Sequence, residues 1–436
     1  MSSTTAINLV KPRGFLHSSE PERRAMRRRQ AEKEICIVFG TRPEAIKLAP
    51  VIQQLEAWGK PFRAVIVNTG QHRELLSPYV RLFGIPIHYD LQIMEPNQTL
   101  NTVCSRVLAS LDRIMAAENP DFVLFQGDTT TAMAAAMAAF HRRIPSGHVE
   151  AGLRSGNPES PYPEEMNRRL ITQMATYHFA ATSGNRNNLL REGIDSRKVF
   201  VTGNPVVDSL QKILKERKAS SSLEELVRAT KGLKLLVLTT HRRESFGEMM
   251  AVNLKALREF ADRHNDVALV FPVHPNPHVS TVASEILSSH PRIHLISPLG
   301  YDDFIHLLSH AWLIVSDSGG VQEEAPSLGK PLLILRENTE RPEAVESGVA
   351  RLVGGNSERL ALMLEEVYAG GTWTEDVKRV ENPFGRGDSG FRIVQAIARA
   401  LHVSAEKSPW KSGAAGLESR FPASEEAREP APALPV

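Results

Sequence analysis

From residue 35 onward, short apolar runs alternate with longer amphipathic stretches in a regular order. Three runs open the series, and each is followed by a turn containing Gly and Thr and then by a helical pattern: ICIVF (35–39), RAVIVN (63–68) and DFVLFQ (121–126). Residues 103–115 carry apolar side chains at the three- and four-residue spacing of a helix with one buried face. VFVTG (199–203) closes this first series.

A second series of the same kind follows a charged, Ser-rich stretch at 211–232, which is typical of a domain boundary. Its strand-like runs are LKLLVLTT (233–240), VALVFPV (267–273), WLIVSD (312–317) and PLLIL (331–335). Apolar strands that alternate with helices are typical of parallel sheets covered on both faces. The sequence therefore predicts an α/β protein with two Rossmann-like domains that face a central cleft. In such folds ligands bind at the carboxyl ends of the strands.

The formal net charge of +2 is unevenly spread along the chain. Residues 1–34 carry +4, residues 404–436 carry −1, and the 369 residues between them carry −1. Because duplex nucleic acids are bound largely by a basic face, the near-neutral body argues against such a partner. No apolar run approaches 18 residues, so we expect no membrane span. The two cysteines cannot form a disulfide framework and favour a reducing, cytoplasmic location.

The segment DSGGVQEE (317–324) has the residues of a phosphate-binding turn. Asp317 ends a strand-like run, and the two glycines after Ser318 let the backbone approach a ligand closely. We expect a helix to begin near Val321, where its N–H groups and dipole would favour a diphosphate. Glu324 could accept hydrogen bonds from ribose hydroxyls; a Gly turn with surface carboxylates is the alternative. This segment has neither GxxxxGK[ST] nor GxGxxG, so it supports neither an ATPase nor a dinucleotide enzyme.

Two further turns carry cations. In FGTRPEAIK, Arg42 precedes Pro43, which suits a helix N1 position, and Lys47 lies one turn further on. In HRRESFGE, His241 is followed by two arginines. Either group could hold a phosphate or a leaving group, and His241 can also exchange protons. For the first pair, a solvated helix start is the alternative.

Three carboxylates follow strand-like runs or turns: Asp128 in GDTTT, Glu150 in GHVEAG and Glu164 in PYPEEMNR. The gaps of 22 and 14 residues exclude a single helix face, but loops from neighbouring strands would bring the three together. Carboxylates with separated pKa values can run general acid and base steps at neutral pH. Asp128 has the alternative role of a helix N-cap before Thr129.

The spacing of His274 and His278 in PVHPNPH makes a metal site the rival interpretation of that segment. Pro275 and Pro277 prevent a regular helix there, so the two imidazoles are not expected to share a face. Zinc-type cysteine spacing is also absent from the sequence. We therefore predict no metal site.

Together these motifs resemble the non-hydrolysing UDP-N-acetylglucosamine 2-epimerases. The matching segments run in family order from about residue 35 to about residue 400 and include FGTRPEAIKLAP, TGQHRELL, GDTTT, GHVEAGLRSG, SPYPEEMNR, THRRESFGE, DSGGVQEEAPSLGKP and ERPEAVESG. The resemblance implies a glycosyltransferase-B-like fold and a homodimeric isomerase that interconverts UDP-GlcNAc and UDP-ManNAc. It implies no metal or nicotinamide cofactor, and a role in supplying ManNAc-type sugars for surface polysaccharide.

The resemblance also sharpens the expected domain organisation. Residues 35–210 would form the N-terminal domain and residues 211–384 a C-terminal domain that binds UDP. A helix at about 385–403 would pack back on the N-terminal domain. Residues 1–34 and 404–436 fall outside the resemblance, and we expect both to be disordered.

The family pattern implies roles for individual residues. Asp128, Glu150 and Glu164 form the acid/base set, and His241 assists the departure of UDP. The positions that match substrate contacts are Arg42, Lys47, Ser318, Gly319, Gly320, Glu324 and Arg341, with Phe304 on the uracil side. Gln71, Arg242 and His274 match positions that contact a second, activating UDP-GlcNAc in some bacterial members. The pattern leaves open which carboxylate serves which face of C2.

Three other functions are weighed against this one. A 2-epimerase acting on 2,3-diacetamido uronic-acid nucleotides would share most of the motifs. A glycosyltransferase of the same fold would need an acceptor, but not three carboxylates around C2. A nucleotide-sugar sensor would have no use for the acid/base groups.

Overall fold

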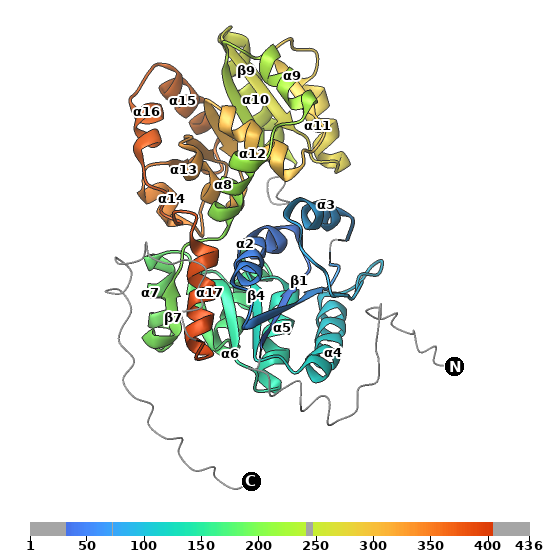
Figure 1. Cartoon of the computed structure of the whole chain (residues 1–436). Coiled ribbons are helices and arrows are strands. Elements are labelled where there is room, and N and C mark those ends of the chain that lie inside the picture. Colours follow the sequence, from blue (N-terminus) through green and yellow to red (C-terminus); the bar gives the residue numbers. More distant parts are fainter. Residues whose placement is uncertain (1–31, 72, 241–246, 404–436) are drawn as a thin grey trace, which may run out of the picture.

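The computed structural model of this chain describes residues 32–71, 73–240 and 247–403. Residues 1–31 of the expected leader, the expected tail, and His241 and Arg242 lie outside these residues. The leader was expected to extend to residue 34, but the first strand already begins at Lys33. Two parallel β-sheets with helices packed around them form two domains, one above the other in Figure 1. The predicted fold class is therefore confirmed.

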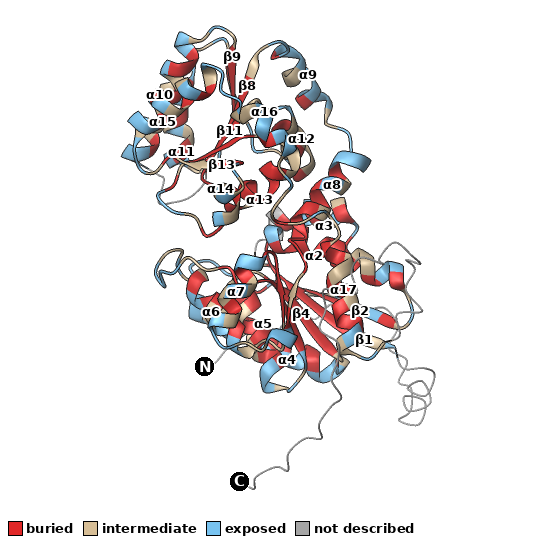
Figure 2. Ribbon diagram, turned by 90° about the vertical axis from the view of Figure 1, so that its left-hand side faces the viewer, coloured by how far each residue is buried: buried red, intermediate tan, exposed pale blue. Residues whose placement is uncertain are grey.

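The first sheet has seven parallel strands in the order β3-β2-β1-β4-β5-β6-β7. Its apolar strands are buried, as Figure 2 shows, because helices cover them. The strands are β1 (Lys33–Phe39), β2 (Phe62–Asn68), β3 (Tyr89–Asp90), β4 (Phe122–Gln126), β5 (Ser146–Ala151), β6 (Tyr177–Ala180) and β7 (Val199–Val201). The helices are α2 (Arg42–Trp58), α3 (Arg73–Phe83), α4 (Leu100–Glu118), α5 (Thr130–His141), α6 (Glu164–Met174) and α7 (Ser183–Arg191).

The second sheet has six parallel strands in the order β10-β9-β8-β11-β12-β13. The strands are β8 (Lys234–Thr239), β9 (Val267–Pro272), β10 (Ile293–Ile296), β11 (Leu313–Ser316), β12 (Leu332–Ile334) and β13 (Ala350–Leu352). The helices are α9 (Ser221–Ala229), α10 (Glu248–Arg263), α11 (Pro277–Leu287), α12 (Tyr301–His310), α13 (Gly319–Leu328), α14 (Pro342–Glu346), α15 (Ser357–Tyr368) and α16 (Trp373–Asp376). No helix among the described residues is both long and apolar enough to cross a membrane.

The stretch at 211–232, interpreted above as a boundary, is largely helical. Helix α8 (Val206–Glu216) leads out of the first sheet, and α9 follows after only four residues. Charged and serine residues are compatible with exposed helix faces, and Ser220 caps α9 by accepting a hydrogen bond from the Leu223 N–H. The charged and serine-rich composition of this stretch therefore indicates solvent-exposed helix faces.

The chain crosses between the domains twice, and the two crossings lie side by side. The first precedes α8; the second precedes the last helix, α17 (Ser389–Ala400). The Asn204 N–H donates to the Phe384 carbonyl at 2.6 Å. A Cβ on Gly203 would lie 3.1 Å from that same carbonyl oxygen, and Gly203 has φ +83°, so glycine allows this close approach.

Helix α17 packs against α2 of the first domain and also contacts α8 (Figure 1). A Cβ on Gly390 would come within 2.9 Å of the Pro50 carbonyl of α2, so the glycine sets how closely the two helices approach. Asp208 of α8 accepts hydrogen bonds from the N–H groups of Ser389 and Gly390, at 3.2 and 2.9 Å. A carboxylate at a helix N-terminus satisfies otherwise unpaired donors and interacts favourably with the helix dipole.

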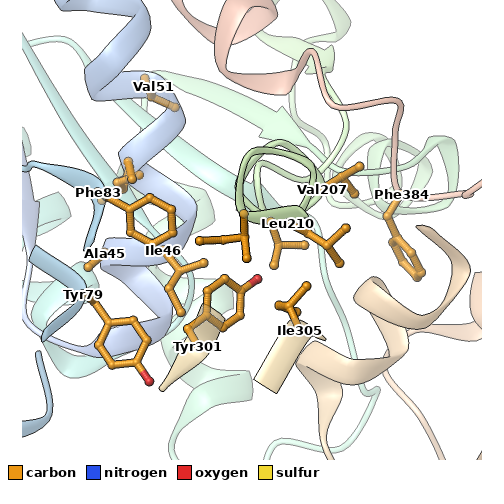
Figure 3. Close-up of a cluster of buried hydrophobic side chains, with 14 of the residues drawn as sticks. Ala45, Ile46, Val51, Tyr79, Phe83, Val207, Leu210, Tyr301, Ile305 and Phe384 are labelled. Atoms are coloured by element: carbon orange, nitrogen blue, oxygen red, sulfur yellow. The ribbon is translucent and has the colours of Figure 1, made fainter. Parts of the chain in front are cut away.

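An apolar cluster joins the two domains next to this crossing. Ile46 of α2, Leu210 of α8 and Ile305 of α12 belong to one buried hydrophobic cluster, drawn in Figure 3. The ring of Tyr301 lies 6.3 Å from the rings of both Tyr79 and Phe83, measured between centroids. Burial of apolar surface from both domains therefore stabilises the contact between them.

We predict that Asp208→Ala weakens the attachment of α17. The two N–H groups that Asp208 accepts would lose their partner, and the loss of a helix-capping acceptor costs about 1–2 kcal/mol. Thermal unfolding should begin at lower temperature, and amide hydrogen exchange should accelerate in α17. Asp388→Ala is the matched control, because Asp388 is the N-cap residue of the same helix but its side chain makes no capping hydrogen bond and pairs with Arg392. Equal effects of the two substitutions would contradict the assignment.

Candidate active site

Four buried charged side chains alternate in sign where the two domains meet. The Lys47 ammonium lies 2.5 Å from a Glu150 oxygen and 2.9 Å from a Glu323 oxygen. The Arg341 guanidinium lies 2.5 Å from Glu323 and 3.4 Å from Glu150. We call these four residues the domain-boundary cluster. Because buried charges are costly unless paired, each charge here depends on its two oppositely charged neighbours.

The cluster continues into the second domain through a further ion pair. Glu340 accepts from Arg341 at 3.0 Å and from Arg336 at 2.7 Å. Three carboxylates thus face three cations, and the extended set is electrically balanced.

Lys47 is positioned by the turn between β1 and α2. Thr41 is the N-cap of α2, and Glu44 accepts hydrogen bonds from the N–H groups of Gly40 and Thr41 at 2.9 and 2.7 Å. The Thr129 hydroxyl donates to the other oxygen of Glu44 at 2.6 Å. This buried carboxylate therefore joins the turn that follows β1 to the turn that follows β4. It also explains how the motifs FGTRPEAIK and GDTTT come together.

Glu150 stands at an irregularity near the end of β5. Its backbone has φ +66°, and the register with β6 shifts between Val149 and Ala151. A non-glycine residue in the left-handed region costs on the order of 1–3 kcal/mol and is typical of functional sites. Gln126 at the end of β4 donates to the carboxylate. Burial raises the pKa of Glu150, while Lys47 and Arg341 act in the opposite direction.

Asp128 is an ion-pair partner and not the N-cap considered above. Thr129 caps α5, since its hydroxyl accepts from the Ala132 N–H at 3.0 Å. Asp128 is bound by the guanidinium of Arg168 at 2.7 Å, and Asn167 donates to its carbonyl at 2.8 Å. Arg168 was not singled out from the sequence, although it stands four residues after Glu164 in the PEEMNR motif.

Glu164 is the first residue of α6 and is partly exposed. The next residue, Glu165, is buried, pairs with Arg168 at 3.1 Å and accepts from the Ser155 N–H at 2.9 Å. The second carboxylate of the pair therefore orients Arg168, whereas the first lies at the edge of the site. Asp128, Glu150 and the first residues of α6 all lie at the carboxyl ends of the strands of the first sheet.

The DSGG turn lies opposite, in the second domain. Ser318 is the N-cap of α13, which begins at Gly319, two residues earlier than expected. A Cβ on Gly319 would approach the Arg341 guanidinium to 2.5 Å, so this glycine gives Arg341 its room. Glu324 accepts a hydrogen bond from the Tyr301 hydroxyl at 2.9 Å, and burial raises its pKa to about 7.

The other predicted contacts lie at varied depths. Arg42 is exposed at the start of α2, with its guanidinium 5.6 Å from the centre of the Tyr79 ring. Phe304 is partly buried on α12. Gln71 accepts from the Thr131 hydroxyl at 2.9 Å. Gly320 is in the first turn of α13, next to Gly319.

His274 is exposed between β9 and α11. Its Nδ1 accepts from the Asn276 N–H at 3.2 Å, whereas His278 lies in the first turn of α11. Among the residues described, no group of three or more His, Cys, Asp or Glu side chains has the arrangement of a metal site.

The fold and this site define a two-domain α/β protein of the glycosyltransferase-B type, with its charged groups at the facing strand ends. A family model for UDP-N-acetylglucosamine 2-epimerase matches residues 56–398. The chain belongs to the UDP-N-acetylglucosamine 2-epimerase family.

Curated relatives agree with this assignment. The chain is 46% identical to the UDP-N-acetylglucosamine 2-epimerase of Salmonella typhimurium over 371 residues, which cover 84% of this chain and 98% of the relative. It is 44% identical to the enzyme of the same name from Escherichia coli strain K12 over 369 residues, with the same coverage.

Solved structures agree as well. The UDP-GlcNAc 2-epimerase of Neisseria meningitidis, solved bound to UDP-GlcNAc, is 42% identical and superposes with a TM-score of 0.79, covering 84% of this chain and 100% of that one. The enzyme of Methanocaldococcus jannaschii, in complex with UDP-GlcNAc and UDP, is 35% identical with a TM-score of 0.71, over 84% and 99%.

Proposed function

We propose that this chain reversibly interconverts UDP-GlcNAc and UDP-ManNAc by inverting C2 of the sugar. The proposal is carried by Glu150, a buried carboxylate on a strained backbone, held between a lysine and an arginine from opposite domains. Membership of the epimerase family and the nucleotide sugar named for the related structures support the substrate.

The chemistry requires both kinds of charge found here. The C2 proton is not acidic, so the C1–O bond to UDP must break as a carboxylate removes that proton, on opposite faces of the ring. The products are UDP and 2-acetamidoglucal, with a C1=C2 double bond. UDP re-adds at C1 after a proton is returned to the other face of C2. Carboxylates near the sugar lower the barrier to proton transfer at C2, and cations near the diphosphate lower the barrier to breaking the C1–O bond.

The acid/base set in this proposal is Asp128, Glu150 and Glu164, with His241 assisting the departure of UDP. Lys47, Arg341 and the backbone of 318–320 would take the diphosphate, and Arg42 would approach it from the edge. Glu324 would accept from the ribose hydroxyls and Phe304 would lie by the uracil. Gln71, Arg242 and His274 would contact a second, activating UDP-GlcNAc.

We predict that the enzyme exchanges the C2 hydrogen of UDP-GlcNAc with solvent. In heavy water, proton NMR should show loss of the H2 signal in both epimers as equilibrium is approached. An epimer that keeps its original C2 hydrogen would rule out the elimination mechanism. A 2,3-diacetamido uronic-acid nucleotide is tested in parallel. If the enzyme turns it over faster than UDP-GlcNAc, that nucleotide and not UDP-GlcNAc is the substrate.

We predict that Glu150→Gln still binds UDP but epimerises about 10²–10⁴ times more slowly. The amide keeps the shape of the side chain but cannot take up or release the proton. UDP affinity by calorimetry and the rate of epimerisation by NMR separate the two effects. Glu159→Gln, a substitution in an exposed loop, should retain the original rate. Unchanged epimerisation in Glu150→Gln would remove Glu150 from the mechanism.

We also propose that the chain forms a homodimer through the first domain and works in the cytoplasm. Large apolar side chains are exposed on the adjacent helices α5 and α6 and just before α6: Phe140, Tyr162, Met166 and Leu170. Exposed apolar side chains grouped in this way are typical of interfaces. Cys36 and Cys104 are both free thiols, as suits a reducing compartment.

We predict that light scattering gives a mass of twice the 48.2 kDa chain. Leu170→Glu would place a charge in the interface and should shift the protein toward monomer. Leu362→Glu on α15 is the matched control, because this leucine is also exposed but lies in the second domain. A monomeric parent protein would contradict the proposed dimer.

A further inference from the structure

Glu323 is the one member of the domain-boundary cluster to which the mechanism above gives no role. Its side chain is only 1% exposed, and it lies on α13 directly before Glu324. It contacts Lys47 of the first domain at 2.9 Å and Arg341 of the second at 2.5 Å. Glu323 is thus as closely bound to both cations as Glu150 is.

The two carboxylates divide the same two cations between them. Lys47 and Glu150 come from the first domain, Glu323 and Arg341 from the second, and each carboxylate bridges the boundary. If Glu323 were absent, both cations would act on the single carboxylate of Glu150 in a poorly solvated site. Since charge interactions strengthen as water is excluded, such a carboxylate would be fixed in its ionised form.

We propose that Glu323 is a positioning residue: by sharing Lys47 and Arg341 with Glu150 across the domain boundary, it leaves Glu150 able to exchange a proton with the sugar. The inference rests on the proposed function, because it assumes that Glu150 takes part in proton transfer. Glu323 itself acts only through its neighbours.

The charge environment of the two carboxylates agrees with this division of roles. The negative charge of Glu323 adds to burial in raising the pKa of Glu150. Although burial acts in the opposite direction, Arg341 and Lys47 lower the pKa of Glu323. The pKa of Glu323 is thus lowered while that of Glu150 is raised.

The groups that face Glu150 come from several elements. They are Lys47 from α2, Glu323 from α13, Arg341 before α14 and the amide of Gln126 from β4. On neighbouring α6, the charges of Glu165 and Arg168 pair with each other and with Asp128. On its own strand, the ring of His148 contacts the Gly127 carbonyl at 2.7 Å. Glu323 is the only carboxylate in this set that touches the same two cations.

The test is the pH profile of kcat/KM for UDP-GlcNAc in Glu323→Gln. With the second negative charge removed, one limb of the profile should move to lower pH by about one unit. It is the acidic limb if Glu150 removes the C2 proton in the direction assayed, and the basic limb if it supplies one. Where Glu150 is the base in the direction assayed, it becomes a weaker one and kcat should fall by up to about tenfold.

Glu340→Gln is the matched control. It removes one buried carboxylate from the same arginine, yet the ion pairs of Glu340 are with Arg341 and Arg336. Its profile should keep both limbs within a few tenths of a unit of the parent. A lower melting temperature with unmoved limbs in Glu323→Gln, or an equal shift in Glu340→Gln, would reduce Glu323 to a structural role and overturn the proposal.

Glu323→Asp covers the case in which the glutamine variant does not fold. The charge is kept but drawn back from both cations, so the limb should move in the same direction by less. Parent-like limbs in this variant, together with an unfolded Glu323→Gln, would also overturn the proposal.

UDP titrations separate failure of this inference from failure of the proposed function. Absence of epimerisation by the parent protein would refute the proposed function. Calorimetry of UDP binding still measures the charge state of the domain-boundary cluster. Protonation of Glu150 frees Lys47 and Arg341 for the diphosphate, so UDP should bind more tightly. The pH midpoint of this tightening should be lower in Glu323→Gln than in the parent, and an identical midpoint would overturn the inference.

Discussion

The pairing of buried charges across the domain boundary is the constraint on which this structure depends. Lys47, Glu150, Glu323 and Arg341 cannot be buried singly, because an isolated charge in a poorly solvated site costs several kcal/mol. Each domain brings one cation and one carboxylate that pair with each other, and each of the four charges gains its second partner from the other domain. In the proposed mechanism the cations that satisfy this arrangement also take the diphosphate, so stability and chemistry would draw on one set of residues.

The fold was largely readable from the sequence because its strands are continuous apolar runs separated by helical periods. The runs at 35–39, 63–68 and 121–126 became the central strands β1, β2 and β4. The strands that were not identified, β3, β6, β10 and β13, are edge or near-edge strands of two to four residues. So short a run contains too few alternating positions to be distinguished from a loop.

The site could be predicted only in part from the sequence. Residue types indicate which chemistry is possible, but they do not show which side chains contact one another. Lys47 and Glu150 were recognised at turns, yet nothing in their spacing indicated that they touch. Asp128 could equally have capped α5; the neighbouring Thr129 takes that place and Asp128 binds Arg168. Glu323 stands beside Glu324 in the sequence, and only the helical rotation between them places one against the cations and the other against Tyr301.

The double crossing between the domains limits how they can move. The segments before α8 and α17 run side by side and are tied by the hydrogen bond from Asn204 to Phe384. Two adjacent connections would resist sliding and twisting more than bending, so any opening of the domains would turn about an axis through both. Opening about that axis would swing Arg341 and Glu323 away from Lys47 and Glu150 as a unit. Admission of substrate and separation of the paired charges would then be a single movement.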